Sequence, residues 1–165
     1  YGAWLALVQI GCTNKLRNGE AAGELRASAL ADIALYNGDA FEEALKYVRE
    51  RTIRGQAVAD FQGVRWKLVD AATDLEAARL LTYRAARLID EGGDAVMPAA
   101  YAKKFATDMA VQRIADCIQA MGANGLRAEY PLARHLAGAK IAAYTDGSIE
   151  MMNERIGAGL GKAFG

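Results

Sequence analysis

The stretch that decides the fold is residues 64–89, which read VRWKLVDAATDLEAARLLTYRAARLI. Apolar and small side chains recur along it in alternating steps of four and three residues: Val64, Leu68, Ala71, Leu75, Ala78, Thr82, Ala85 and Ile89. This spacing puts them on one stripe of a long α-helix, a heptad seam on which small alanines allow a neighbouring helix to approach closely. The helix is expected to stop at residues 91–93 (Glu-Gly-Gly), because glycine is favoured just after a helix C-terminus.

The segments on either side of this helix carry similar spacing. A first helix is expected over residues 25–51, with Leu30, Ala34, Phe41, Leu45 and Val48 on one face, and it breaks at residues 54–56 (Arg-Gly-Gln). A third is expected from about Pro98 to Gly122, with an inward face of Val111, Ile114, Ile118 and Met121. A short turn over residues 127–136 (RAEYPLARHL) then leads to a shorter helix from about Ser148.

These four helices define the predicted fold class. Short glycine-marked connections between long helices are typical of an all-α, antiparallel (up-down) four-helix bundle. The chain has no alternating apolar–polar run that would need a sheet. We therefore expect residues 25–165 to form the bundle domain and leave residues 1–24 unassigned.

Composition narrows the class of protein. The 165 residues are 53% hydrophobic, which excludes disorder, and 20 basic residues balance 20 acidic ones, which disfavours nucleic-acid and anionic-membrane partners. Cys12 and Cys117 form neither a disulfide framework nor a metal-ligand spacing, so a reducing cytoplasm is the expected location. No secretory signal is visible, and the apolar run at residues 4–10 is far below the ~20 residues of a membrane span.

Spacing alone reveals little chemistry. His135 is expected to be a surface or packing residue, and Cys117 an inert core thiol among apolar neighbours. Two glycine-containing loops, residues 121–125 (MGANG) and 144–148 (YTDGS), lie at helix boundaries. They fit two interpretations. One is structural: a glycine C-cap for the first, and for the second a turn in which Asp146 caps the last helix. The other is functional: glycines let a flat ligand approach the backbone beside a helix N-terminus that favours an anion.

Two longer stretches resemble the acyl-CoA dehydrogenase family. Residues 43–86 (EALKYVRERTIRGQAVADFQGVRWKLVDAATDLEAARLLTYRAA) are similar to its Tyr-x-x-x-Arg-x-x-Phe-Gly segment, which precedes a Gln and a long Ala/Leu-rich helix. Residues 115–148 (ADCIQAMGANGLRAEYPLARHLAGAKIAAYTDGS) resemble its Gln-x-x-Gly-Gly-x-Gly, Glu-Tyr-Pro and Tyr-Glu-Gly-Thr series. The resemblance needs no gap between Arg26 and Ser148 and leaves residues 1–22 outside it.

The resemblance implies an activity. Such enzymes bind FAD between the subunits of a tetramer and desaturate an acyl-CoA thioester: a carboxylate takes the α proton, and the β hydrogen leaves as hydride to the flavin. By this resemblance Asp146 is the catalytic base, Gly147 and Arg26 contact the acyl-CoA substrate, and the chain forms a homo-oligomer, a dimer or a tetramer. No metal is implied.

The resemblance also implies a set of FAD contacts. Arg51 matches an arginine that meets the flavin pyrophosphate across a subunit boundary, a role that suits a permanently charged fork donor. Residues 119–123 fall on the loop that lies against the neighbouring flavin. The implied cofactor contacts are Arg51, Thr52, Ile53, Phe61, Gln62, Gln119, Gly122, Ala123, Ser148 and Glu150.

Three positions depart from the family pattern. Arg54 replaces the aromatic of Arg-x-x-Phe-Gly, Ala123 replaces the second glycine of the Gly-Gly pair, and Asp146 replaces a glutamate. An aspartate reaches less far by ~1.5 Å, and a misplacement of ~1 Å can slow a reacting pair ~100-fold. Some members use Asp here for ring-containing acyl thioesters, and a relative that acts on nitroalkanes also uses Asp.

A third group of relatives carries its base on the helix of Arg26, at the residue just before that arginine. In this chain that residue is Leu25, and Glu24 would point about 100° away on a helix. Asp146 is therefore preferred over Glu24 as the base.

Three hypotheses follow. The first is an FAD-dependent acyl-CoA dehydrogenase with Asp146 as the base, and the second is a flavin oxidase of the nitroalkane type on the same fold. The third is a non-catalytic oligomerisation subunit, favoured by Arg54, Ala123 and Asp146. Relatives also have an N-terminal helical domain and a middle β domain, so this chain alone is expected not to turn over substrate.

Overall fold

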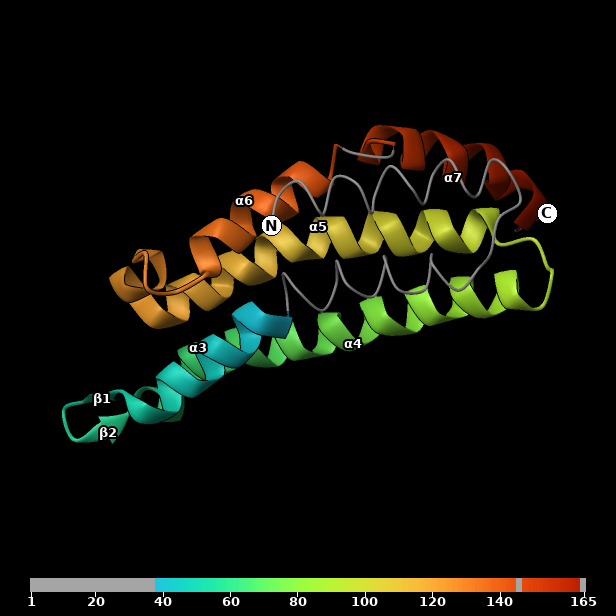
Figure 1. Cartoon of the computed structure of the whole chain (residues 1–165). Helices are drawn as coiled ribbons and strands as arrows, with labels where there is room; N and C mark the ends of the chain where they lie inside the picture. The colour runs from blue at the N-terminus through green and yellow to red at the C-terminus, as the bar shows by residue number, and fades with distance from the viewer. Residues whose placement is uncertain (1–37, 145–146, 164–165) are drawn as a thin grey trace.

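The computed structural model describes residues 38–144 and 147–163, and this part of the chain is almost wholly helical (Figure 1). Its elements in chain order are α3 (Asp39–Glu50), β1 (Thr52–Ile53), β2 (Gln56–Ala57), the 3-10 turn η2 (Val58–Asp60), α4 (Gln62–Asp90), α5 (Val96–Met121), the 3-10 turn η3 (Gly122–Leu126), α6 (Leu132–Ala142) and α7 (Ile149–Ala163). The predicted all-α class is confirmed. Residues 1–24 and the start of the first predicted helix lie outside the described residues.

Helix α4 follows the predicted heptad seam. The buried positions along it are Leu68, Ala71, Leu75, Ala78, Thr82 and Ala85, as the spacing requires, with Ala86 beside them. The buried hydroxyl of Thr82 donates to the carbonyl of Ala78 at 2.9 Å, so no polar atom on that side chain is left unsatisfied. The helix ends where predicted, because Gly92 takes a φ of +70° that favours glycine.

Helix α5 packs antiparallel to α4 after a short connection (Figure 1). The Asp94 side chain accepts the N–H of Val96 at 3.0 Å and so satisfies a donor of the first turn. Of the predicted inward face, Ile114 and Met121 are buried, and Val111 and Ile118 are partly buried against the same core.

The core joins four helices. Its members come from α3, α4, α5 and α6, and the largest fully buried side chains are Ile114, Leu132, Val48 and Cys117. Several contributions from α3 and α4 are alanines, for example Ala40, Ala44, Ala71 and Ala78, so the helices meet at close range. Close packing of this kind is sensitive to added volume.

The predicted turn over residues 127–136 is wrong in its second half. Helix α6 begins at Leu132, directly after Pro131, and runs to Ala142. Its buried residues Leu132 and Ala139 lie on one helix face with the partly buried Leu136, but this face covers only two turns and the run contains Gly138. The apolar period was therefore too weak to predict the helix, which tertiary packing against α5 stabilises instead.

A second correction concerns the break after α3. The sequence predicted a simple interruption at residues 54–56, but the chain forms a small antiparallel hairpin there, in which Thr52 pairs with Ala57 and Ile53 with Gln56. Arg54 and Gly55 form its tip with φ of +54° and +79°. Positive φ at both central residues is the hallmark of the turn whose twist matches that of paired strands.

Candidate functional site

The hairpin presents the first group of predicted cofactor contacts. Arg51 ends α3: its N–H donates to the carbonyl of Tyr47 at 2.9 Å, and its own carbonyl accepts the N–H of Val58 at 2.8 Å. These bonds fix the base of the hairpin on the helix. The side chains of Arg51, Thr52 and Ile53 are exposed, with Ile53 at 47%.

The start of α4 presents the second group. Phe61 precedes the helix in extended conformation, and its carbonyl accepts the N–H groups of Val64 and Arg65 at 3.0 Å each. Gln62 is the first helical residue and is exposed, and the ring of Phe61 is 37% exposed. An aromatic ring and an amide are thus available beside the hairpin.

The end of α5 presents the third group. Gln119 is exposed, and its carbonyl accepts the N–H of Gly122, which caps the helix with φ +63° and ψ −146°. Only glycine adopts this combination readily, so the predicted glycine C-cap is confirmed. A Cβ on Gly122 would meet no atom within 4 Å, and Ala123 beside it is exposed. The loop therefore has an open face.

Gly125 in the same loop is required for another reason. A Cβ there would lie 2.9 Å from the Cα of Ile118 and 3.0 Å from its carbonyl oxygen. The turn η3 therefore lies directly against the backbone of α5. The two glycines of MGANG thus have separate functions: one allows the conformation and the other the close approach.

The three groups meet at one end of the bundle (Figure 1). The hairpin, the start of α4 and η3 all lie at this end. A hydrogen bond joins the loop after α5 to the helix that leads into the hairpin, because Asn124 of η3 donates through Nδ2 to the phenol oxygen of Tyr47 on α3 at 2.5 Å. We call this end of the molecule, made of residues 51–62 and 119–124, the hairpin end.

The remaining predicted contacts lie elsewhere, at the junction between α6 and α7. Gly147 has a φ of +98°, and Ser148 precedes α7, where its Oγ accepts the N–H of Met151 at 3.5 Å. A hydrogen bond with Ser148 lowers the pKa of Glu150, which lies in the first turn of α7. The predicted base Asp146, its alternative Glu24 and the predicted substrate contact Arg26 lie outside the described residues.

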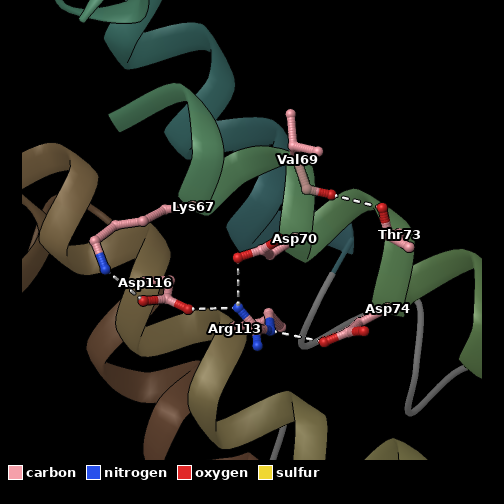
Figure 2. Close-up of polar contacts among 7 residues, drawn as sticks. All are labelled: Lys67, Val69, Asp70, Thr73, Asp74, Arg113 and Asp116. Carbon is pink, nitrogen blue, oxygen red and sulfur yellow. Dashed lines mark hydrogen bonds and ion pairs between the residues drawn. The ribbon is translucent and has the colours of Figure 1, made fainter. Parts of the chain in front are cut away.

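A network of ion pairs supports the end of α5 from the α4 side (Figure 2). Asp116 accepts hydrogen bonds from Lys67 Nζ at 2.9 Å and from Arg113 at 2.8 Å, and Arg113 also donates to Asp74 at 2.8 Å. The Asp116 side chain is only 10% exposed, so this carboxylate depends on its two cationic partners. Asp116 lies about one helical turn before Gln119, and the network thereby fixes α5 just before the predicted cofactor loop.

Two other kinds of site, a metal centre and a reactive thiol, are absent from the described residues. No group of three or more His, Cys, Asp or Glu side chains there could hold a metal ion. Cys117 is buried in the core, as predicted, and this burial raises the pKa of its thiol to about 12. Burial also lowers the pKa of His135, which is half-buried on α6, as a packing residue would be. In the part of the chain that the structure describes, no helix is long and apolar enough to cross a membrane.

The hairpin end suits a flat anionic ligand. It offers the permanently charged guanidinium of Arg51, the exposed ring of Phe61, the amide of Gln62 and a glycine loop with an open face. Arg54 adds a second exposed guanidinium at the hairpin tip. The hairpin end therefore combines positive charge, which suits a diphosphate, with an open stretch of loop backbone, which suits a flat ring system.

Sequence reasoning missed Tyr47, Asn124 and Tyr130. The rings of Tyr47 and Tyr130 meet edge to face, with centroids 6.0 Å apart at 84°. Tyr47 and Asn124 stood inside the quoted motifs, but their contact joins positions 77 residues apart, which no local pattern reveals. The available signal was that Tyr47 and Tyr130 are the tyrosines of the Tyr-x-x-x-Arg and Glu-Tyr-Pro motifs.

Comparison with known proteins gives consistent matches. The family model described as "Acyl-CoA dehydrogenase, C-terminal domain" matches residues 20–161. The short/branched chain specific acyl-CoA dehydrogenase of Rattus norvegicus mitochondria is 38% identical over 108 residues, which cover 66% of this chain and 25% of that protein. The chain thus spans about a quarter of the length of this curated relative.

Solved structures match over a larger part of the chain. Butyryl-CoA dehydrogenase from Megasphaera elsdenii is similar with a TM-score of 0.75 at 32% identity, covering 84% of this chain and 37% of that one. The FAD complex of PigA is similar with a TM-score of 0.74 at 30% identity, covering 84% of this chain and 38% of that one.

Proposed function

Because this chain belongs to the acyl-CoA dehydrogenase family and matches its C-terminal domain, we propose that it is the catalytic-base domain of an FAD-dependent enzyme that desaturates an acyl-CoA thioester. The observation that carries the proposal is the hairpin end, where three separate chain segments bring eight predicted cofactor contacts to one end of the bundle. A bundle that served only for packing would have no need of these exposed groups there.

The hairpin end would hold the cofactor. Arg51 would bind the pyrophosphate of FAD, with Thr52 and Ile53 beside it, and Phe61 and Gln62 would contact the adenine side or the pyrophosphate. Gln119, Gly122 and Ala123 would lie against the flavin of a neighbouring subunit. The similarity to a structure of an FAD complex supports this choice of cofactor. When bound, FAD would supply the hydride acceptor that the chain's own side chains lack.

Asp146 would take the α proton of the thioester. A carboxylate suits this role if its surroundings raise its pKa toward the working range. Gly147 and Arg26 would contact the acyl-CoA, and Ser148 and Glu150 would contact the cofactor at the α6–α7 junction. The shorter aspartate then requires that the reacting carbon lie closer to the α6–α7 junction than it would for a glutamate.

The activity would need more chain than these 165 residues. The chain covers a quarter of the length of the rat enzyme and 37% of the butyryl-CoA dehydrogenase chain. The remaining domains of such relatives would complete the acyl pocket. We therefore expect the 165-residue chain to show no turnover by itself, and robust activity of the purified chain would refute this part of the proposal.

Assembly is the second part of the proposal. Helix α4 exposes an apolar stripe on its outer face, made of Trp66, Val69, Leu80 and Tyr83, which are 60%, 54%, 61% and 50% exposed. Their spacing places them along one side of the helix, and a solvent-exposed stripe of this kind typically marks an interface. A homo-oligomer, a dimer or a tetramer, would cover it. Sedimentation of a Leu80→Glu variant tests this, since a monomer is expected in place of the oligomer.

The central experiment uses the full-length gene product. It is mixed with FAD, and reduction of the flavin by a panel of acyl-CoA thioesters is followed as bleaching of its visible absorbance. Bleaching is expected in the unmodified protein and should be lost in Asp146→Asn, whereas Glu154→Gln, an exposed carboxylate on α7, should bleach normally. Bleaching that survives in Asp146→Asn would remove this residue as the base.

Two other outcomes correspond to the alternative functions. Bound FAD that no thioester bleaches, but that oxygen reoxidises quickly after chemical reduction, would favour a flavin oxidase of the nitroalkane type. Failure to bind FAD at full length would leave a non-catalytic oligomerisation subunit.

A further inference from the structure

Tyr47 contacts two of the segments at the hairpin end, the Arg51 hairpin and the loop after α5. It lies near the end of α3, and its backbone carbonyl accepts the N–H of Arg51 at 2.9 Å. Its phenol oxygen accepts a hydrogen bond from Nδ2 of Asn124 at 2.5 Å. One residue thus connects the start of the hairpin to the loop after α5.

Both partners in this hydrogen bond are held in place. The half-buried ring of Tyr47 meets the ring of Tyr130 edge to face at 6.0 Å between centroids, which restricts its rotation. The backbone carbonyl of Asn124 accepts the N–H of Arg127 at 3.0 Å, and the carbonyl of Arg127 accepts the N–H of Tyr130 at 3.1 Å. The Tyr47 phenol and the Asn124 amide are therefore already in place for their hydrogen bond.

The loop that carries Asn124 is exposed on one side and packs against α5 and α6 on the other. Gly122 and Ala123 are exposed, and a side chain added at Gly122 would meet nothing within 4 Å. On its other side, Gly125 is pressed against Ile118, which fixes the loop relative to α5 but not relative to α3. The hydrogen bond between Asn124 and Tyr47 links the loop directly to α3.

We propose that Tyr47 is a positioning residue for the cofactor, whose hydrogen bond to Asn124 sets the separation between the Arg51 hairpin and the loop of residues 119–123. The proposal rests on the proposed function, because those are the two segments assigned to FAD. A ligand that bridges both segments binds best when their separation is already correct, since ordering them on binding costs affinity. Tyr47 and Asn124 act through these segments and need not touch the ligand.

The test measures FAD binding to the full-length apoprotein. Tyr47→Phe removes the phenol oxygen and keeps the ring that packs on Tyr130. The dissociation constant of FAD, from quenching of flavin fluorescence, is expected to rise about five- to tenfold, the equivalent of one hydrogen bond. The visible absorption bands of the bound flavin should shift as well. The matched control is Tyr101→Phe, a half-buried tyrosine near the start of α5, which should leave the dissociation constant within about twofold.

A double-mutant cycle identifies the partner. Asn124→Ala should weaken FAD binding to a similar extent, and the Tyr47→Phe/Asn124→Ala pair should weaken it no further, because both changes break the same bond. Additive losses would overturn the proposal. It would also fall if Tyr47→Phe lowered only the melting temperature of the apoprotein and left the dissociation constant and the spectrum unchanged. If the unmodified protein binds no FAD, the proposed function fails instead, so the two failures are distinguishable.

Discussion

Replacing Asp116 by asparagine should separate the buried ion network from ordinary surface pairs. In the native structure its carboxylate accepts from Lys67 at 2.9 Å and from Arg113 at 2.8 Å (Figure 2). A hydrogen bond to a charged group contributes about 1.5–3 kcal/mol net. Asparagine keeps one oxygen acceptor but loses the charge, and the Lys67 side chain is 40% exposed, so water recovers part of its solvation. Arg113 keeps its bond to Asp74 at 2.8 Å. We expect Asp116→Asn to lower the free energy of unfolding by about 2–3 kcal/mol.

The matched control is the same substitution on the same helix. Asp108 pairs with Lys104 one turn away at 2.7 Å, and its side chain is 47% exposed. Asp108→Asn should therefore cost no more than about 0.5 kcal/mol. Urea titrations of both variants, followed by the helical circular dichroism signal, give the comparison. A difference below about 0.5 kcal/mol between them would refute the reasoning that burial makes Asp116 depend on its partners.

The remaining predictions concern the glycine loop, the hairpin tip and the buried thiol. Gly125→Ala should destabilise the fold by about 2 kcal/mol, since its Cβ would lie 2.9 Å from the Cα of Ile118. Gly63→Ala in α4 should instead stabilise the fold by about 0.5–1 kcal/mol. Urea titration measures both changes, and equal effects would contradict the steric argument. Arg54→Gly should stabilise the apoprotein by about 1 kcal/mol, because Arg54 has a φ of +54°, and a lower melting temperature would count against this. Cys117 should resist iodoacetamide at pH 8 until urea unfolds the chain, because burial raises its pKa from 9.0 to about 12. The raised pKa favours the protonated thiol, so its contribution to stability is complete below pH 9 and lost as the pH rises towards 12.

The long helices could be predicted because periodicity and glycine signals agree there. The seam of α4 repeats over many turns, and its buried positions match the predicted ones from Leu68 to Ala85. Gly92 and Gly122 end α4 and α5 with positive φ, as glycines after helices commonly do. Where several turns carry the same stripe and a glycine follows, sequence alone decides the element and its C-terminal end.

Short elements gave no comparable signal. Helix α6 fully buries only Leu132 and Ala139, and together with the partly buried Leu136 they mark a face over just two turns. The hairpin has two residues in each strand, which is too short for any alternation, and its tip places an arginine where asparagine or glycine is usual. Both elements depend on what they pack against, and spacing along the chain does not contain that information.

The candidate site was reached by resemblance more than by spacing. Spacing identified the loop at residues 121–125 as unusual but favoured a plain C-cap as its interpretation, and that cap is present at Gly122. The structure adds that this loop lies at the same end of the bundle as the Arg51 hairpin. The assignment of Asp146 as base stays a prediction, since that residue lies outside the described ones.

Two of the three departures from the family pattern, Arg54 and Ala123, lie where they affect a ligand more than the fold. Arg54 and Ala123 are both exposed, one at the hairpin tip and the other beside Gly122, and neither belongs to the core. The packed residues near these two positions are Val58, a core residue that follows the hairpin, and Gly125, which lies against α5. Since a change at an exposed tip leaves that packing intact, the bundle can form with Arg54 and Ala123 in place. Their consequence is therefore to be sought in the affinity for the cofactor and in its spectrum, which the Tyr47 experiment already measures.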